Sequence, residues 1–324
     1  MIPFYLTEGL FSKFMTHLSV VIPVYNESSL IEELVKRVKQ NVKYITEDFE
    51  IIIVDDGSQD KTWELIKKEA LNEKRIKGIK FTRNFGHHFA ITAGLHNTSG
   101  EWVVVMDGDL QDRPEVIPVL YEEAQAGYEV VFVSRQNRPE KQYYKIAQKI
   151  FYLSLKNLSG MDFDSSQANF SIISRKVVEA FRGFPESSRF YGSTIKWLGF
   201  SRSSVLADHG TRFSGKPSYT IKKRVKLASD IIISFSDRPL KFAIGVSITN
   251  SVFALGFLFW VLLKFFVFDD KNFETSKTLI ILILTASLTS MVLGMIGLYL
   301  NQIFNQVKNR PLYVIEMAVN FDKQ

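Results

Sequence analysis

Two segments of this chain place acidic residues directly after a run of β-branched side chains. Asp107 and Asp109 follow the valines of 103–105, and Asp55 and Asp56 follow the isoleucines of 51–53. Ligands of open α/β sheets bind at the carboxyl ends of the strands, so we expect both pairs at one sheet edge. Asp-Gly alone is also an ordinary turn sequence. The repetition of the pattern predicts a site for a phosphate-rich substrate.

The residue types in these segments indicate a hard divalent cation. Asp107 and Asp109 are carboxylates one residue apart, and Gln111 can add a third oxygen. Such oxygens suit Mg²⁺ or Mn²⁺, which commonly sit between carboxylates and substrate phosphates. A cation at this place would stabilise a diphosphate leaving group. Asp55 and Asp56 are predicted to bind the base or ribose of a nucleotide.

The composition excludes several classes of protein. The chain has 324 residues, a net charge of +6 and no cysteine, so disulfides and thiolate metal sites are absent. It carries no GxxxxGK[ST], GxGxxG or GxSxG motif, which argues against kinases, ATPases, nicotinamide enzymes and serine hydrolases. We find no nucleic-acid-binding motif. His87 and His88 are adjacent and point apart on any regular element, so we predict structural roles for them.

The first half of the chain alternates strand-like and helix-like segments. This order is typical of an α/β domain, with a mostly parallel sheet, helices on both faces and right-handed crossovers. The predicted strands are 18–24, 49–54, 76–81, 102–106 and 129–134, and the predicted helices are 30–42, 60–70, 89–98 and 114–126.

The second half indicates a membrane. Residues 242–263 and 279–300 carry no charge, and each run exceeds the about 20 residues that cross a bilayer. Six basic residues lie between 222 and 241, so the positive-inside rule predicts both termini in the cytoplasm. Basic amphipathic segments at 141–158 and 221–237 are predicted to lie at the membrane surface. We expect residues 1–17 to form an extension, 18–220 the catalytic domain and 305–324 a cytoplasmic tail.

Several motifs together resemble the family 2 glycosyltransferases of the GT-A fold. Within that family the chain is similar to the polyprenyl-phosphate branch, which includes bactoprenol glucosyltransferases and dolichol-phosphate mannose synthases. The two membrane spans after an Arg-x-x-Gly-x-Ser-x-Tyr-like segment are typical of this branch. The resemblance extends from about 18 to 314, and its motifs are 21–27, 54–58, 83–87, 106–115, 133–135, 212–219 and 307–311.

This resemblance implies roles at the matching positions. Pro23, Tyr25, Glu27 and Asp55 would line the nucleotide pocket, while Asp107, Asp109 and Gln111 would hold the metal. Arg135 and Arg212 would lie near the phosphates of donor or acceptor. Attack by the lipid phosphate with inversion at the anomeric carbon would release a nucleoside diphosphate.

Two positions depart from the family pattern. Asn169 replaces an aspartate offered as the catalytic base, and Gly297-Leu298-Tyr299 replaces Gly-Glu-Tyr in the last span. An amide is no base, but a phosphate monoester has a second pKa of about 6 and is largely ionised at neutral pH. Positioning and metal electrostatics could then supply most of the rate.

The sequence therefore predicts a metal-dependent enzyme of the bacterial cytoplasmic membrane. It would move a sugar, with UDP-glucose or UDP-N-acetylglucosamine as guessed donors, to undecaprenyl phosphate, and would form a homo-oligomer, with a tetramer possible. No nucleic-acid partner is expected. A non-catalytic protein that binds nucleotide sugar or lipid is the alternative, and a transferase with a different acceptor is another.

Overall fold

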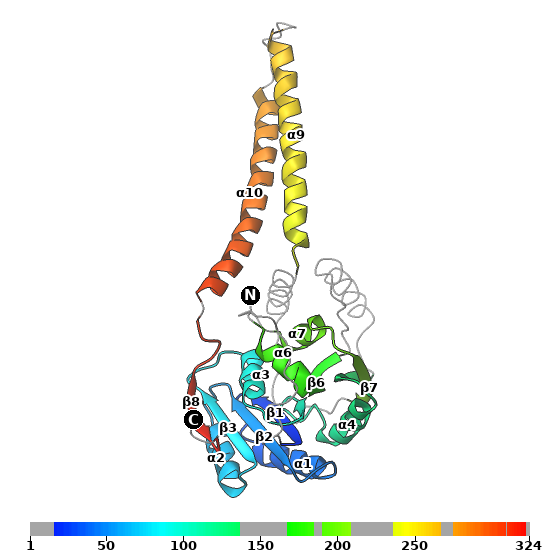
Figure 1. The fold of residues 1–324 in the computed structure, drawn as a ribbon. Helices are drawn as coiled ribbons and strands as arrows, with labels where there is room; N and C mark the ends of the chain where they lie inside the picture. Colours follow the sequence, from blue (N-terminus) through cyan, green and yellow to red (C-terminus); the bar gives the residue numbers. More distant parts are fainter. Residues whose placement is uncertain are drawn as a thin grey trace. The chain divides into compact units, whose positions relative to one another are not determined.

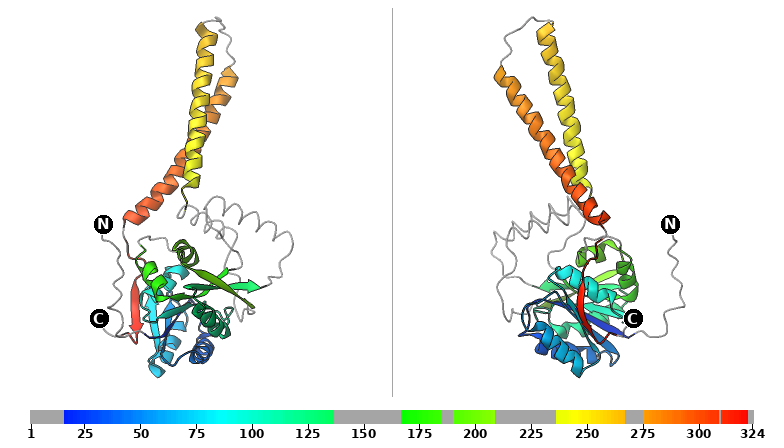
Figure 2. Two further views of the ribbon diagram at one scale, coloured as in Figure 1. Left: turned by 45° about the vertical axis from the view of Figure 1, so that its right-hand side comes forward. Right: turned by 90° about the vertical axis from the view of Figure 1, so that its left-hand side faces the viewer.

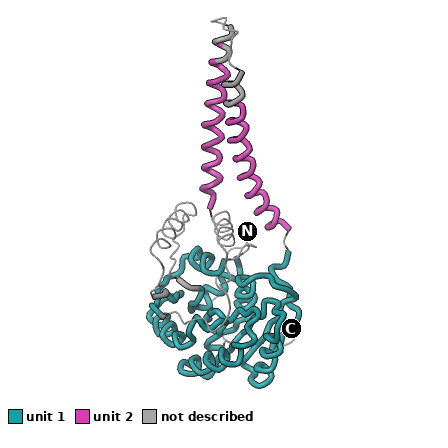
Figure 3. The backbone as a smooth tube through the Cα atoms, turned by 180° about the vertical axis from the view of Figure 1, so that it is seen from behind, with its two compact units in different colours: residues 1–141, 164–217, 310–324 teal, residues 142–163, 218–309 magenta. Residues whose placement is uncertain are grey.

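The computed structural model describes residues 16–136, 167–184, 190–208, 236–266, 275–308 and 310–321. The chain divides into two compact units (Figure 3), which are described separately below. The first contains residues 1–141, 164–217 and 310–324, and the second contains 142–163 and 218–309. The amphipathic segments at 141–158 and 221–235, and most of the predicted extension at 1–17, lie outside the described residues.

The first unit is built on an eight-stranded sheet in the order β7-β5-β6-β4-β1-β2-β3-β8 (Figure 1). Four of its seven pairings are parallel and three are antiparallel, so the sheet is mixed. The strands are β1 (Leu18–Val24), β2 (Phe49–Asp55), β3 (Ile76–Phe81), β4 (Trp102–Val105), β5 (Val130–Gln136), β6 (Gln167–Ser174), β7 (Arg202–Asp208) and β8 (Ile315–Val319).

Helices cover both faces of this sheet, as predicted. Because side chains alternate along a strand, each central strand contributes to both faces. Helices α1, α2 and α4 pack with Val20 and Ile22 of β1, and α3, α6 and α7 pack with Val21. The helices are α1 (Ile31–Lys43), α2 (Thr62–Asn72), α3 (His87–His96), the 3₁₀ turn η1 (Pro114–Val116), α4 (Ile117–Gln125), α6 (Arg175–Arg182) and α7 (Tyr191–Trp197).

The central strands are buried on both faces. Every residue of β1 and β2 is buried, which explains their continuous runs of Val and Ile. The parallel register aligns Val24 of β1 with Asp55 of β2, and Val21 of β1 with Val105 of β4. The carboxyl ends of β1, β2 and β4 therefore meet at one edge of the sheet.

The segment 305–324, predicted to be a cytoplasmic tail, contains a strand of the eight-stranded sheet. β8 is an edge strand of this sheet and pairs antiparallel with β3 (Figure 2). Tyr313 stacks on Phe81 with ring centroids 5.1 Å apart, and the Asn320 amide donates to the carbonyl oxygen of Ile76 at 2.8 Å. The sequence prediction missed this strand because its hydrogen-bonding partner lies more than 200 residues earlier in the chain.

The second unit contains two long apolar helices, α9 (Arg238–Phe266) and α10 (Thr275–Val307), which pack against each other. Segments Arg238–Trp260 and Ile281–Val307 are long and apolar enough to cross a membrane. Hydroxyl groups inside them donate to carbonyls four residues earlier, as Thr249 does to Gly245 and Ser287 to Ile283. Such internal hydrogen bonds satisfy polar groups where no water is present.

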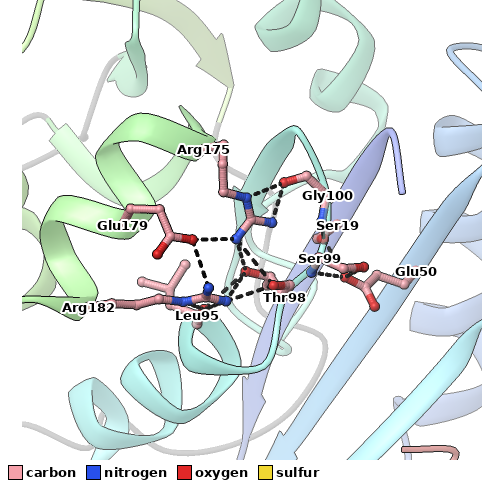
Figure 4. A network of polar contacts seen from close by, with 9 residues as sticks. All are labelled: Ser19, Glu50, Leu95, Thr98, Ser99, Gly100, Arg175, Glu179 and Arg182. Carbon is pink, nitrogen blue, oxygen red and sulfur yellow. Dashed lines mark hydrogen bonds and ion pairs between the residues drawn. The ribbon is translucent and has the colours of Figure 1, made fainter. Parts of the chain in front are cut away.

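A buried polar network lies at the amino ends of β1, β2 and β4, opposite the edge where their carboxyl ends meet (Figure 4). The Glu50 carboxylate accepts hydrogen bonds from Ser19 Oγ and Ser99 N, both at 2.6 Å, and lies 2.7 Å from Lys77 Nζ. Burial alone would raise the pKa of Glu50, but these three partners outweigh burial and hold the pKa below its usual value.

The same network fastens helix α6 to the turn before β4. Arg175 Nε donates to Gly100 O at 2.8 Å, and Arg182 Nη2 donates to Thr98 O at 2.7 Å. Gly100 N in turn donates to Ser19 Oγ at 2.8 Å, which joins the arginines to the Glu50 cluster. The network therefore links β1, β2, β4 and α6 at one end of the sheet.

We predict that Glu50→Gln lowers the free energy of unfolding at pH 7 by about 1–3 kcal/mol. A carboxyl whose pKa is depressed in the folded state stabilises the protein above its unfolded pKa, and this stabilisation is lost as the pH falls. The difference between wild type and variant in apparent melting temperature should therefore shrink from pH 7 to pH 4. Glu64→Gln, an exposed change on α2, is the control. A difference that does not vary with pH would contradict the assigned ion pair.

Candidate active site

Asp55 occupies the last position of β2 and is fully buried. Its Oδ1 accepts a hydrogen bond from Ser58 N at 2.9 Å, while Oδ2 is buried without a hydrogen-bond partner among the described residues. Burial raises the pKa of this carboxyl. A buried unpaired carboxyl oxygen is costly, so a bound molecule with an N–H or O–H group would be stabilised here.

The loops after β1 and β2 are joined by four hydrogen bonds from backbone N–H groups to side chains. Asn26, with φ of 55°, contributes two of these contacts. The bonds are Asn26 N to Ser58 Oγ, Gln59 N to Asn26 Oδ1, Glu27 N to Thr62 Oγ1 and Ser28 N to Asp60 Oδ2, at 2.9 to 3.2 Å. The two loops therefore form one rigid rim beside Asp55.

The other residues predicted to line the nucleotide pocket differ in exposure. Tyr25 is 42% exposed directly after β1, and Glu27 is half-buried in the rim. Pro23 is buried within β1, where it pairs with Val54 of β2, so it contributes to the packing of the strand end. Tyr25 is thus the side chain of this group that a planar ligand could contact.

Asp56 makes contacts that the sequence did not predict. Its role in binding nucleotide stays a prediction; it is 3% exposed, and its carboxylate accepts hydrogen bonds from Phe85 N at 2.7 Å and Gly86 N at 3.0 Å. Burial raises the pKa of Asp56. Both oxygens face the backbone before α3, so Asp56 holds the protein's own loop.

Residues 107–112 form a tight turn after β4. Asp112 Oδ2 accepts a hydrogen bond from Asp107 N at 3.1 Å, and Asp109 Oδ1 accepts one from Gln111 N at 3.0 Å. Leu110 has φ of 58°, which reverses the chain. A Cβ atom on Gly108 would lie 2.5 Å from Val24 Cγ1, so only glycine lets this turn pack against β1.

The donor atoms of this turn fit a hard divalent cation. Asp107, Asp109 and Gln111 are all half-buried, and their oxygens match the ligands of Mg²⁺ and Mn²⁺. Within the described ranges, no group of three or more His, Cys, Asp or Glu residues could hold a metal. A cation held by the oxygens of this turn would need further ligands, which substrate phosphates and water could supply.

Asn169 and His87 lie beside Asp107. Strand β6 pairs antiparallel with β4, with Ser171 opposite Val105, so Asn169 lies level with Asp107 just beyond the last pair. His87 Nε2 lies 3.2 Å from Asp107 Oδ1 and 3.3 Å from Asn169 Nδ2. Burial would lower the pKa of His87, but the charge of Asp107 outweighs burial and raises it.

His88 has different hydrogen-bond partners from His87, but the two rings do not point apart as predicted: they lie edge to face with centroids 5.5 Å apart. His88 Nδ1 accepts a hydrogen bond from Tyr191 N at 3.4 Å, and its ring packs edge-on against Phe190. Burial and the neighbouring His87 lower the pKa of His88 to about 3. His88 is therefore a neutral structural histidine.

The two arginines predicted to lie near the phosphates are placed only in part. Arg135 belongs to β5, next to the residue that pairs with the start of β6, but its side chain lies outside the described residues. Arg212 lies outside them entirely. Their phosphate contacts stay predictions.

Comparison with known proteins identifies the family. The model named "Glycosyl transferase family 2" matches residues 19–181, a stretch that contains Asp55, Asp107, Asp109 and Asn169. A relative from Bacillus subtilis, the uncharacterized glycosyltransferase YkcC, is 34% identical over 309 residues, which cover 94% of this chain and 95% of the relative. The chain belongs to glycosyl transferase family 2.

Other matches to this transferase include a named enzyme and a solved structure. The undecaprenyl-phosphate 4-deoxy-4-formamido-L-arabinose transferase of Photorhabdus laumondii is 33% identical over 94% of this chain and 95% of its own length. A glucosyl-3-phosphoglycerate synthase from Mycobacterium tuberculosis, crystallised with Mn²⁺, UDP and phosphoglyceric acid, aligns with a TM-score of 0.49 and 18% identity. That alignment covers 67% of this chain and 76% of the synthase.

The transferase places one residue at its site that the sequence analysis set aside. His87 was predicted to be structural, because it forms no metal pair with His88. The signal that could have located it is the motif at 83–87, which ends at His87; in the structure, the contacts of Asp56 with Phe85 and Gly86 precede the residue beside Asp107.

We predict that Gly57→Ala strongly destabilises the transferase. Gly57 has φ of +72°, and a Cβ atom there would lie 2.3 Å from the carbonyl carbon of Arg83. Gly199, with φ of +76° and its nearest neighbouring atom at 4.0 Å, provides a matched control. Gly199→Ala should cost about 1 kcal/mol from backbone strain alone, whereas Gly57→Ala should cost more than about 3 kcal/mol. Equal losses of apparent melting temperature would contradict the close approach at Gly57.

Proposed function

We propose that this transferase moves a sugar from a nucleoside-diphosphate sugar to undecaprenyl phosphate at a membrane. The observation that carries the proposal is the shared sheet edge. Asp55 ends β2 with an Oδ2 that has no hydrogen-bond partner among the described residues, and the Asp107–Asp112 turn follows β4, on the other side of β1. A base N–H fits the first feature, and a diphosphate with a divalent cation fits the second. UDP-glucose and UDP-N-acetylglucosamine are the donors we would test first.

The acceptor is proposed from the second unit and from the relatives. Apolar side chains of α9 and α10 are widely exposed, with Leu255 at 67% and Leu293 at 63%. Exposed apolar surface of this extent is stabilised by a partner or a lipid phase. Several relatives that cover 94% of this chain are named as transferases acting on undecaprenyl phosphate. A lipid phosphate is therefore the acceptor that fits both observations.

The proposed reaction needs no protein base. A phosphate oxygen of the lipid forms a bond to the anomeric carbon, and the bond from that carbon to the diphosphate oxygen breaks. The electron pair leaves with the nucleoside diphosphate, whose charge a divalent cation would stabilise. Because the attacking phosphate is already largely ionised at neutral pH, the amide of Asn169 is compatible with catalysis.

Location and assembly follow from the same proposal. The basic residues before α9 and after α10 favour both termini on the cytoplasmic side of a bacterial inner membrane. A homo-oligomer, with a tetramer as one form, would cover part of the exposed apolar surface of the helices. Arg135 and Arg212 are proposed to contact phosphates of donor or acceptor.

We predict that Asp109→Asn lowers sugar transfer at least about 100-fold, because it removes charge that stabilises the leaving diphosphate. The measurement is transfer of radiolabel from a panel of nucleotide sugars to undecaprenyl phosphate in detergent, with Mg²⁺, with Mn²⁺ and with chelator. Asp48→Asn makes the same change at an exposed position before β2 and should leave transfer unchanged.

The outcomes separate the possible functions. Metal-dependent label in the organic phase supports the proposal and identifies the sugar. Label that stays in the aqueous phase would indicate a different acceptor. No label with any donor, in protein that still binds UDP, would indicate the non-catalytic alternative that Asn169 suggests.

A further inference from the structure

His87 occupies a place between three elements of the site. It is the first residue of α3, and its Nε2 lies 3.2 Å from Asp107 Oδ1 on the turn after β4. The same nitrogen lies 3.3 Å from the Asn169 side-chain amide on β6. Asp107 Oδ1 is shielded from solvent, so its charge requires compensation from the protein.

The backbone before His87 is held by two independent constraints. Asp56 accepts the N–H groups of Phe85 and Gly86, which fixes the approach to α3. Gly86 has φ of 118° and ψ of 149°, a conformation essentially restricted to glycine. The loop therefore delivers the residue after Gly86 to one position.

The histidine next in sequence limits motion of the helix start. His88 accepts a hydrogen bond from Tyr191 N at the start of α7, and its carbonyl accepts one from Thr92 Oγ1 at 2.8 Å. With its backbone held at Gly86 and His88, His87 can rotate only about its own side-chain torsions. A side chain anchored in this way can orient a neighbour.

The available donors and acceptors determine which group donates in the contacts of His87 with Asp107 and Asn169. A carboxylate has only acceptors, so His87 Nε2 must carry a proton to approach Asp107 Oδ1 favourably. That N–H cannot also accept from an amide N–H. Asn169 is therefore best satisfied with its oxygen toward His87, an orientation reached by a half-turn of the amide.

We propose that His87 is a positioning residue that holds the Asp107 carboxylate in the orientation needed at the donor-diphosphate site, with Asn169 supporting the imidazole from β6. The inference rests on the proposed function, because it assigns a purpose to the Asp107–Asp112 turn. Groups that orient a metal ligand through a hydrogen bond typically change metal affinity or activity by about 10–100-fold when removed.

The test compares three histidine variants of the full-length protein in detergent. The readouts are Mn²⁺ affinity in the presence of UDP, from the free-Mn²⁺ paramagnetic resonance signal, and sugar transfer to undecaprenyl phosphate. His87→Leu should weaken Mn²⁺ binding and lower transfer about 10–100-fold. His87→Gln, whose amide N–H can replace Nε2–H, should restore most of both. His17→Leu, at the opposite edge of the sheet beside Tyr121, should match wild type.

Two results would overturn the inference. The first is wild-type Mn²⁺ affinity in His87→Leu. The second is equal loss in His87→Leu and His87→Gln with a lowered melting temperature, which would indicate a structural role alone. Asp109→Asn tests the proposed metal site independently of His87. If Asp109→Asn also binds Mn²⁺ as tightly as wild type, the assignment of the metal site is wrong. Loss in Asp109→Asn with none in His87→Leu overturns only the role of His87.

Discussion

The site depends on the parallel register of β2, β1 and β4. Parallel strands in one sheet share a direction, so their carboxyl ends meet at a single edge. Here that register aligns Val24 with Asp55 and Val21 with Val105, and all the acidic residues follow from these positions. The buried runs of Val and Ile maintain the register, because a slip by one residue would exchange the two packed faces.

Adjacent carboxylates at the end of β2 serve opposite purposes. Asp56 turns its oxygens to the backbone of Phe85 and Gly86, while Asp55 keeps Oδ2 unpaired among the described residues. The pleat of the strand end separates the two side chains. One carboxylate therefore stabilises the loop that leads to His87, and the other retains binding capacity for a ligand.

Two other features stabilise the sheet that carries the acidic residues. The Glu50 network at the amino ends of β1 and β2 joins the strands to α6, and β8 covers the outer edge of β3. The Glu50 network lies at the opposite end of the strands from Asp55, whereas β8 is separated from Asp55 by β3, whose Lys80 pairs with both Asp55 and Met317. The membership of the chain in glycosyl transferase family 2 is consistent with this division, in which a rigid sheet supports a site made from short loops.

Local sequence patterns account for much of this protein. The alternation of apolar runs with amphipathic segments predicted β1 to β5 and their helices to within a few residues, and two long uncharged runs predicted α9 and α10. These features are encoded locally, by side-chain period and length. The spacing of Asp107, Asp109 and Gln111 predicts a cation site, because carboxylate and amide oxygens are the ligands that hard cations prefer, and metal binding there stays a prediction.

Tertiary packing, in contrast, established which residues meet. β6, β7 and β8 were missed, and each pairs with a strand distant in the sequence, a partner that local periodicity does not encode. Asp56 looked identical in kind to Asp55, and its role became clear only from the N–H groups that face it. His87 lies beside Asp107, twenty residues further along the chain, because the contacts of Asp56 and the conformation of Gly86 bring it there.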